Sequence, residues 1–260
     1  MSQNLRKTLI ILLSLVLLIS VSVSVFFRVQ KLQSSKNQEE AQEIVSAEPT
    51  PEPEEEVVEE VVEIDPYVEV LREIDLAALQ AVNDDVIGWI TIPDTQLSYP
   101  IMYSGDNSYY LTHTWDKQYN SAGSVFLEQH CSPDLSDFNT ILYGHRMRDG
   151  SMFAQLDNFT DQAFFLENPY IYFDTLTEQH TYKILSVFLT TATAGEGFLY
   201  HTFVDASDET AFQEFVDTCK QLSLYDTGVT AAYGDKLITL STCEYSQENG
   251  RLVVVAKRIG

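Results

Sequence analysis

Two nearly continuous apolar runs close to the C-terminus dominate the hydrophobic pattern of this chain. Lys236–Cys243 and Arg251–Lys257 have a composition typical of buried strands, and the polar segment Glu244–Gly250 separates them. The pattern predicts two strands joined by a short connection. Cys243 would end the first strand and Arg251 would begin the second, so both side chains are expected at one rim of a sheet.

Shorter β-type runs precede this pair, with turn residues between them. Many short strands with few long helices are typical of a barrel or a sandwich. The chain is therefore expected to be mainly β with added helices. The other predicted strands are Gly88–Ile92, Leu97–Met102, Ser124–Leu127, Thr140–Tyr143, Tyr170–Phe173 and Thr181–Leu189.

Apolar residues recur at helical spacing in two regions. Between Pro66 and Asn83 they predict one or two helices that pack as an N-terminal cap. The amphipathic segment Asp208–Leu222 predicts a longer helix with Cys219 on its buried stripe. Two short helices are also expected, at Ser151–Leu156 and Asp161–Leu166.

The N-terminal region contains a long apolar run. Thr8–Phe27 has about the length that a bilayer requires, and Arg6 and Lys7 precede it. A basic start before apolar residues also suits a cleaved signal peptide, but the run ends without a small-x-small cleavage site. We therefore expect residues 8–27 to be a retained transmembrane signal anchor.

An acidic segment follows the apolar run. Residues 34–66 lose hydrophobic periodicity, and residues 39–65 hold twelve acidic side chains and no basic one. Such a composition cannot bury enough apolar surface to become ordered. Residues 28–66 are predicted to form a disordered acidic stalk, with an acidic docking tail as the less favoured alternative. Residues 1–66 are then expected to be dispensable for the chemistry.

The charge balance excludes nucleic acid as a partner. The formal net charge is −24, and residues 66–260 hold 27 acidic side chains against ten basic ones. Nucleic-acid binding needs a basic face, and the chain after the apolar run offers none.

Three cysteines are present, Cys131, Cys219 and Cys243, and none forms a C-x-x-C pair. A bridge between Cys131 and Cys219 is possible, but an odd count leaves at least one free thiol. His130 and Cys131 could form half of a metal site, yet no second pair at ligand spacing accompanies them. No metal or other cofactor is expected.

His145 adds a third reactive group to Cys243 and Arg251. It follows the predicted strand Thr140–Tyr143 and should also lie at a strand end. A cysteine reacts as the thiolate, a nearby cation favours that form, and a histidine can protonate a leaving amine. Each residue also has an ordinary structural interpretation when it is considered alone. Cys243 would be a buried thiol, His145 an imidazole with internal hydrogen bonds, and Arg251 a solvated guanidinium.

Several motifs together resemble the signature of sortases, in particular those of class B. Thr239–Cys243 is followed by Arg251, and Tyr143-Gly-His145 is followed by Gly150–Ala154. The resemblance extends from about residue 67 to the C-terminus. It continues through Ile87–Ile90, Tyr99-Pro100, Asn107–Leu111 and Gly123–Phe126.

The resemblance implies an eight-stranded sortase-type β-barrel over residues 67–260, with N-terminal helices and an inserted helix near residues 208–222. It implies a nucleophile at Cys243, a general acid/base at His145 and an oxyanion or substrate stabiliser at Arg251. Thr242 and Ser241 are expected to contact substrate.

The resemblance also implies a location and partners. Residues 1–7 would be cytoplasmic, and the catalytic domain would lie outside a single-pass membrane anchor. The enzyme would cleave a C-terminal sorting motif of secreted proteins through a thioacyl-enzyme. The acyl group would pass to an amine of a cell-wall peptide or to a pilin lysine.

Two alternatives stay open at this point. A cysteine endopeptidase would use the same three residues and release its product to water. A non-catalytic surface module would bind partners through aromatic loops such as Tyr109-Tyr110 and Trp115. The sequence does not choose between wall anchoring and pilus assembly.

Overall fold

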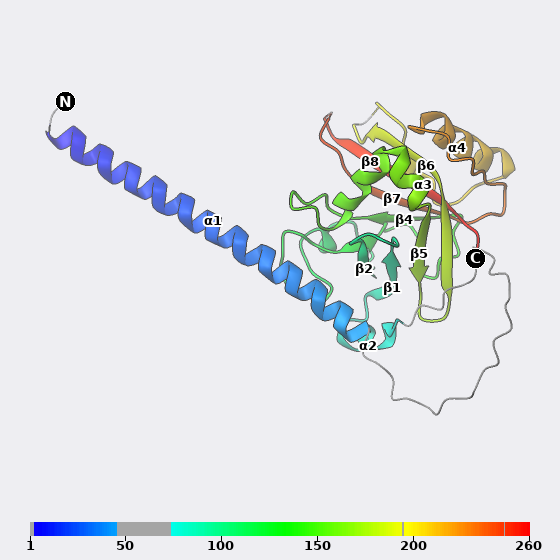
Figure 1. The fold of residues 1–260 in the computed structure, drawn as a ribbon, viewed down its shortest axis with the longest axis horizontal. Helices are drawn as coiled ribbons and strands as arrows, with labels where there is room; N and C mark the ends of the chain where they lie inside the picture. Colours follow the sequence, from blue (N-terminus) through cyan, green and yellow to red (C-terminus); the bar gives the residue numbers. More distant parts are fainter. Residues whose placement is uncertain (1–2, 46–73, 194, 247) are drawn as a thin grey trace.

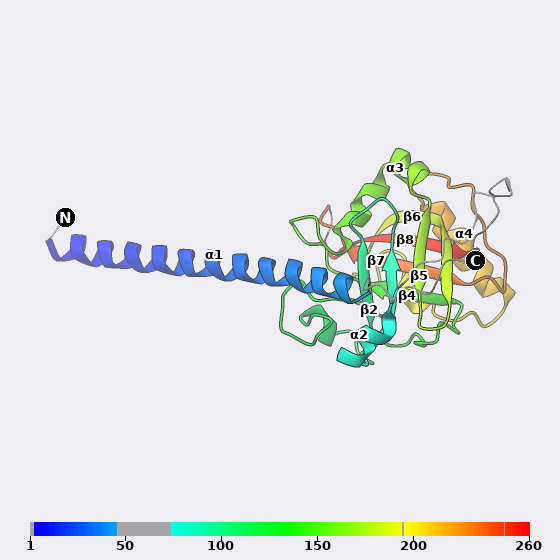
Figure 2. The same cartoon turned by 60° about the horizontal axis from the view of Figure 1, so that its bottom comes forward.

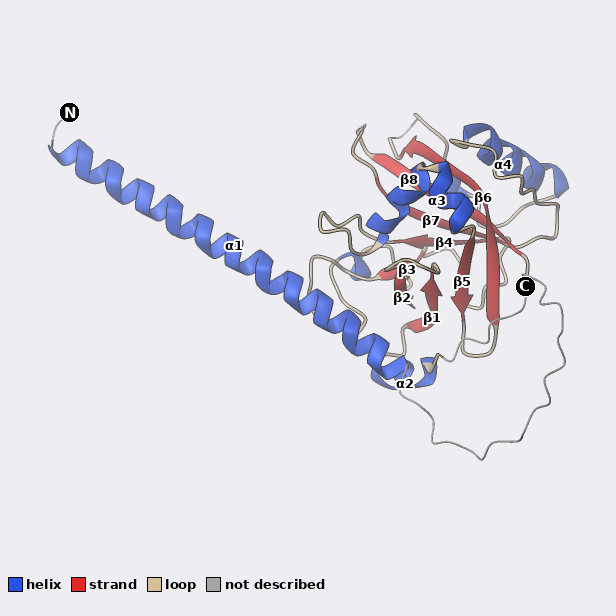
Figure 3. Cartoon of the chain, in the orientation of Figure 1, coloured by secondary structure: helices blue, strands red, loops and turns tan. Residues whose placement is uncertain are grey.

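The computed structural model describes residues 3–45, 74–193, 195–246 and 248–260. Its described strands close into one eight-stranded barrel in the order β1-β2-β3-β4-β7-β8-β6-β5, which confirms the predicted mainly β fold (Figure 1, Figure 3). The strands are β1 Val86–Thr91, β2 Ser98–Met102, β3 Val125–Leu127, β4 Asn139–Tyr143, β5 Tyr170–Asp174, β6 Gln179–Thr191, β7 Leu237–Cys243 and β8 Gly250–Arg258.

Two neighbouring pairs in the barrel are parallel, β2 with β3 and β4 with β7, and the other pairs are antiparallel. Strand β7 is buried at six of its seven positions, because both of its faces are covered: Ile238 and Leu240 belong to the barrel core, and Leu237 packs in the cluster that contains the α4 side chains. A strand was predicted here because the run Lys236–Cys243 is nearly all apolar. The mixture of parallel and antiparallel pairs has no corresponding sequence pattern.

Short helices fill the connections. They are α2 Leu76–Val82, the 3₁₀ helices η1 Tyr109–Leu111, η2 Phe153–Thr160 and η3 Tyr200–Thr202, and the α-helices α3 Gln162–Glu167 and α4 Glu209–Leu222. Asp208 caps α4 by accepting a hydrogen bond from the Ala211 N–H at 2.9 Å. The buried stripe of α4, which includes Phe212 and Cys219, packs against β6 as the amphipathic pattern predicted.

A buried polar contact joins β4 to β7 inside the core. The Thr239 hydroxyl donates to the Asn139 amide oxygen at 2.8 Å, and both side chains are fully buried. The Asn139 amide nitrogen donates in turn to the Phe203 carbonyl at 2.8 Å. Buried polar atoms destabilise a fold when they lack partners, so this contact favours one register of β7 against β4.

The N-terminal helix α1, Gln3–Val45, differs from the predicted stalk. Residues 28–45 continue the helix, because their Gln, Glu, Lys and Ala residues have high helix propensity. The rest of the predicted stalk, residues 46–66, lies outside the described residues. Figure 2 shows α1 leaving the barrel beside α2 and β2, away from α4.

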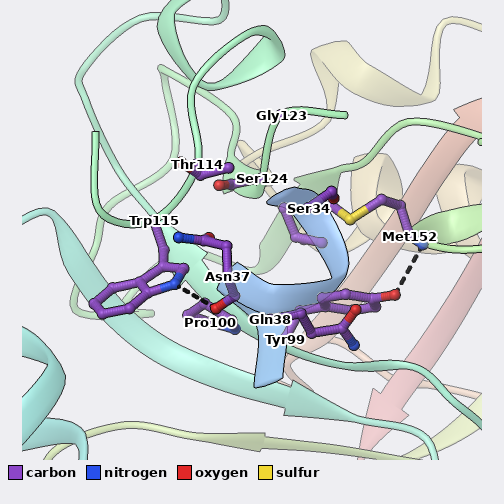
Figure 4. A pocket seen from close by; sticks show the side chains of 11 residues that line it. Ser34, Asn37, Gln38, Tyr99, Pro100, Thr114, Trp115, Gly123, Ser124 and Met152 are labelled. Atoms are coloured by element: carbon purple, nitrogen blue, oxygen red, sulfur yellow. Dashed lines mark hydrogen bonds between the residues drawn. The ribbon is translucent and has the colours of Figure 1, made fainter. Parts of the chain in front are cut away.

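The C-terminal half of α1 is bound to the barrel by hydrogen bonds and packing. The Trp115 indole N–H donates to the Asn37 carbonyl at 2.9 Å, in the small pocket between α1 and β2 that Figure 4 shows. The Gln30 side chain accepts from the Ser121 N–H at 3.1 Å, and Lys31 pairs with Asp149 at 3.3 Å. Ala41 and Val45 join a buried cluster with Trp115.

Among the described residues, no helix is both long enough and apolar enough to cross a membrane. The side chains of residues 3–15 and 18 lie outside the description, so the anchor at residues 8–27 stays a prediction.

The contacts of α1 add a role in stability for its C-terminal half, while residues 1–66 are still expected to be dispensable for the chemistry. A chain that begins at residue 66 should unfold at a temperature at least about 4 °C lower than a chain that begins at residue 28. Exposing Trp115 and breaking the polar contacts should cost about 2 kcal/mol or more. Thermal unfolding followed by circular dichroism measures this, and equal midpoints would show that α1 adds nothing to the barrel.

Candidate active site

Strand pairing brings the three predicted reactive residues to one rim of the barrel. In the parallel pair of β4 and β7, Tyr143 lies beside Ser241, and two residues further on each chain stand His145 and Cys243. In the antiparallel pair of β7 and β8, Cys243 lies directly opposite Arg251. The carboxyl ends of parallel strands meet at the same edge, so this topology is sufficient to gather the three side chains.

A pocket of about 320 Å³ lies at this rim. All five residues singled out from the sequence line it, namely Ser241, Thr242, Cys243, His145 and Arg251. The wall is completed by Asn107, Leu111, Phe126, Tyr143, Gly144, Ala192, Tyr200 and His201.

Cys243 differs from the other two cysteines in its exposure. All three thiols are free, but Cys131 and Cys219 are buried, whereas Cys243 is partly exposed at the pocket. Burial raises the pKa of Cys131 to about 12 and raises that of Cys219 as well, so both stay protonated and unreactive. The possible bridge between Cys131 and Cys219 is not formed.

His145 is held by backbone groups. Its Nε2 lies 2.8 Å from the Leu111 carbonyl oxygen, and its own carbonyl accepts from the Phe153 N–H at 2.9 Å. A carbonyl oxygen can only accept, so this contact requires a proton on Nε2 and leaves Nδ1 as the atom that can gain one. No carboxylate pairs with His145 within the described part of the chain.

Gly144 allows this strand end to lie close to the helix that follows. A Cβ at this position would stand 2.7 Å from the Phe153 ring, far inside contact distance. The Thr242 hydroxyl donates to the Gly144 carbonyl at 2.8 Å. Thr242 therefore fastens the residue before Cys243 to the residue before His145.

Arg251 makes no ion pair with any carboxylate in the described residues. Its Nη1 donates to the carbonyls of Asn249 and Gly250, at 3.1 and 2.9 Å. These bonds orient the guanidinium, while its other N–H groups can serve a ligand. Asn249, in the short connection between β7 and β8, has a φ of 50°.

Glu244, which follows the predicted nucleophile, is engaged in its own turn. Its carboxylate accepts from the Ser246 N–H at 2.8 Å and from the Ser246 hydroxyl. Although partial burial opposes ionisation, the hydrogen bonds from Ser246 hold the pKa of Glu244 below its usual range. The carboxylate thus stays charged, and its lone pairs are directed to Ser246.

Ser241 is paired with a residue that the sequence analysis missed. Its hydroxyl lies 2.6 Å from the Tyr200 hydroxyl, which reaches the pocket from η3. Burial raises the pKa of Tyr200, so its hydroxyl keeps its proton. Leu111 was missed as a partner of His145 because the contact uses its backbone carbonyl, which no side-chain pattern reports.

The described residues contain no group of three or more His, Cys, Asp or Glu side chains that could hold a metal ion.

The chain matches known proteins over most of its length. A sortase-domain family profile matches residues 90–259. Sortase B of Listeria monocytogenes is 36% identical over 71% of this chain and 74% of its own. Sortase B of Staphylococcus aureus is 32% identical over 70% of this chain and 73% of its own.

Solved structures agree with these matches. The crystal structure of sortase B from B. anthracis in complex with AAEK1 superposes with a TM-score of 0.70, at 35% identity, covering 89% of this chain and 98% of that one. The Staphylococcus aureus sortase B-substrate complex gives a TM-score of 0.65 at 32% identity, covering 70% and 83%. The fold, the motifs and these matches together show that the chain belongs to the sortase family of cysteine transpeptidases, in its class B.

Proposed function

We propose that this transpeptidase cleaves a C-terminal sorting motif of secreted proteins through a thioacyl-enzyme on Cys243 and transfers the acyl group to an amine. The observation that carries the proposal is the shared pocket. A partly exposed free thiol, an imidazole and a guanidinium that has no ion pair with a described carboxylate line it together. The solved S. aureus relative is a complex with a substrate, which supports substrate binding by this fold.

In the first half of the reaction the Cys243 sulfur attacks the scissile carbonyl carbon. Arg251 stabilises the negative charge that develops on the carbonyl oxygen. When the carbon–nitrogen bond breaks, protonated His145 gives its Nδ1 proton to the leaving amine. The product is a thioester on Cys243, a covalent intermediate that divides one difficult step into two.

In the second half His145 takes a proton from the incoming amine, which attacks the thioester carbon. The Cys243 sulfur leaves as thiolate, and an amide forms. One amide replaces another, so the overall reaction needs no nucleotide. Thr242 and Ser241 would contact the substrate as parts of the pocket wall, because both hydroxyls already have internal partners and both backbones are paired in the β7 ladders.

The acceptor is proposed to be an amine of a cell-wall peptide or a pilin lysine. Sortases are associated with the cell surface, and a secreted protein with a C-terminal motif meets the enzyme there. The alternative in this pocket is an endopeptidase, in which water attacks the thioester. The nature of the second nucleophile separates the two.

Adding an amine should redirect the product. The full chain is incubated with a library of C-terminal sorting peptides, with and without glycinamide, and the products are identified by mass spectrometry. We expect amide products with glycinamide and a slow release of free acid without it.

The Cys243→Ala variant provides the control for this experiment. It should bind the selected peptide but form neither acyl adduct nor product. Free acid at the same rate and yield with and without glycinamide would instead establish an endopeptidase.

Removing the acid/base should stop turnover without unfolding the chain. His145→Ala is expected to lose about 10²–10⁴-fold in kcat, the range that general acid–base catalysis contributes. His130→Ala is the comparison for kcat only, because its side chain is 72% exposed and contacts Glu128 outside the pocket. Steady-state rates measure both variants, and a greater loss in His130→Ala would move the role to that residue.

Replacing the guanidinium by an ammonium should also be costly. Arg251→Lys keeps the charge but loses the planar fork, so a loss of about 10²–10³-fold in kcat is expected. Arg258→Lys changes an arginine at the other end of β8, 3.7 Å from Glu178, and should leave the rate unchanged. A folded Arg251→Lys enzyme within a few-fold of the unaltered chain would remove Arg251 from the mechanism.

A further inference from the structure

Glu128 is a buried acid that the mechanism does not use. It follows β3 and is 4% exposed, and its backbone N–H donates to the Ile141 carbonyl of β4 at 2.9 Å. Placing a carboxylate in the interior is costly unless donors surround it. A buried acid one strand away from the catalytic rim therefore needs an explanation from its partners.

Three donors meet the carboxylate of Glu128. Its Oε1 accepts from the Asn107 amide nitrogen at 2.8 Å and lies 3.0 Å from His130 Nδ1. Its Oε2 accepts from the His130 backbone N–H at 2.7 Å. Oε1 is thus shared between the Asn107 amide and the His130 ring, and Oε2 is held by the His130 backbone.

Asn107 is held at both ends of its amide. Its nitrogen donates to Glu128, and its oxygen accepts from the Gln129 N–H at 2.9 Å. This pair of contacts fixes which end is nitrogen, because a flipped amide would place donor against donor and oxygen against carboxylate. The second N–H of the amide has no partner within the described residues, and Asn107 lines the pocket of Cys243 and His145.

The same segment carries the partner of His145. Asp106 accepts hydrogen bonds from the Ser108 and Tyr109 N–H groups, at 2.6 and 2.8 Å, and makes a tight turn next to Asn107. The chain then enters η1 and presents the Leu111 carbonyl to His145. Asn107 and Leu111 form one wall of the pocket, and Glu128 holds this wall from behind.

We propose that Glu128 is a positioning residue of this active site. Its carboxylate orients the Asn107 amide so that one N–H points into the pocket, as a donor to a carbonyl oxygen of the bound peptide. The proposal rests on the proposed function, because it requires a peptide in that pocket.

Glutamine at position 128 has the same shape as glutamate, but it replaces one acceptor oxygen by an NH₂ donor. Its single oxygen can face either Asn107 or the His130 N–H, and its NH₂ group then opposes the other donor. Neither orientation satisfies both sides. One orientation releases the Asn107 amide and the other leaves the His130 backbone N–H unpaired, so the variant Glu128→Gln weakens the hold on Asn107 with little change in volume.

The test compares single and double variants of the full chain on the sorting peptide selected above, with glycinamide as acceptor. Glu128→Gln is expected to raise KM for the peptide about tenfold, the effect of one hydrogen bond, with kcat within about threefold. Asn107→Ala should raise KM to the same extent. The double variant should be no worse than either single one, because both changes remove the same contact.

Asp137→Asn is the matched control. Asp137 is also buried, 8% exposed, and accepts hydrogen bonds from Ser132 in the loop that follows Glu128. It does not line the pocket, so its KM should be unchanged. A general loosening of this loop would instead raise KM in both acid variants and lower both melting temperatures.

Three results would overturn the role of Glu128. They are an unchanged KM in the folded Glu128→Gln enzyme, an additive effect in the double variant, and a KM that rises to the same extent in Asp137→Asn. If Glu128→Gln does not fold, Asn107→Ala still tests the contact from the pocket side, and an unchanged KM in that variant overturns the proposal. Lack of peptide turnover by the unaltered chain contradicts the proposed function itself and is recognised before any variant is compared.

Discussion

Strand β7 carries the constraint on which the rest of the site depends, because it is hydrogen-bonded on both edges. Its parallel pairing with β4 sets the ends of the two strands side by side, and its antiparallel pairing with β8 sets Cys243 opposite Arg251. A shift of one residue would turn every β7 side chain to the opposite face. The placement of the nucleophile is therefore a property of strand register rather than of a flexible loop.

The polar side chains of β7 protect this register. Thr239 binds Asn139, Ser241 binds Tyr200 and Thr242 binds the Gly144 carbonyl. All three β7 side chains are buried, so any other register would leave hydroxyls without partners at a cost of about 1–3 kcal/mol each. The same contacts hold the groups around Cys243 in place before substrate arrives, which reduces the reorganisation needed during reaction.

The sequence predicted those parts of the molecule that depend on side-chain patterns. Apolar runs such as Lys236–Cys243 located all eight strands, and the stripe containing Phe212 located α4. The closed eight-stranded barrel came from the family resemblance, and the order of its strands was not predicted, because mixed pairing has no local signal. The five pocket residues were named in advance on their motifs, whereas their roles remain proposals.

Two features could not be predicted, for different physical reasons. Residues 28–45 lack an apolar stripe, since much of their contact with the barrel is polar, as between Asn37 and Trp115. The disorder expected from their composition was therefore wrong. The Leu111 carbonyl that orients His145 is a backbone atom, and every residue type supplies one.

Arg251 remains available in a strongly acidic chain because the carboxylate next to the nucleophile is engaged elsewhere. Glu244 accepts both of its hydrogen bonds from Ser246, and Arg251 is oriented by two backbone carbonyls instead of an acid. An exposed ion pair between them would add at most about 1 kcal/mol to stability. A donor placed on a developing oxyanion lowers the barrier by about 3–4 kcal/mol. In the proposed role, the small stability lost by leaving Arg251 unpaired is outweighed by its effect on the rate.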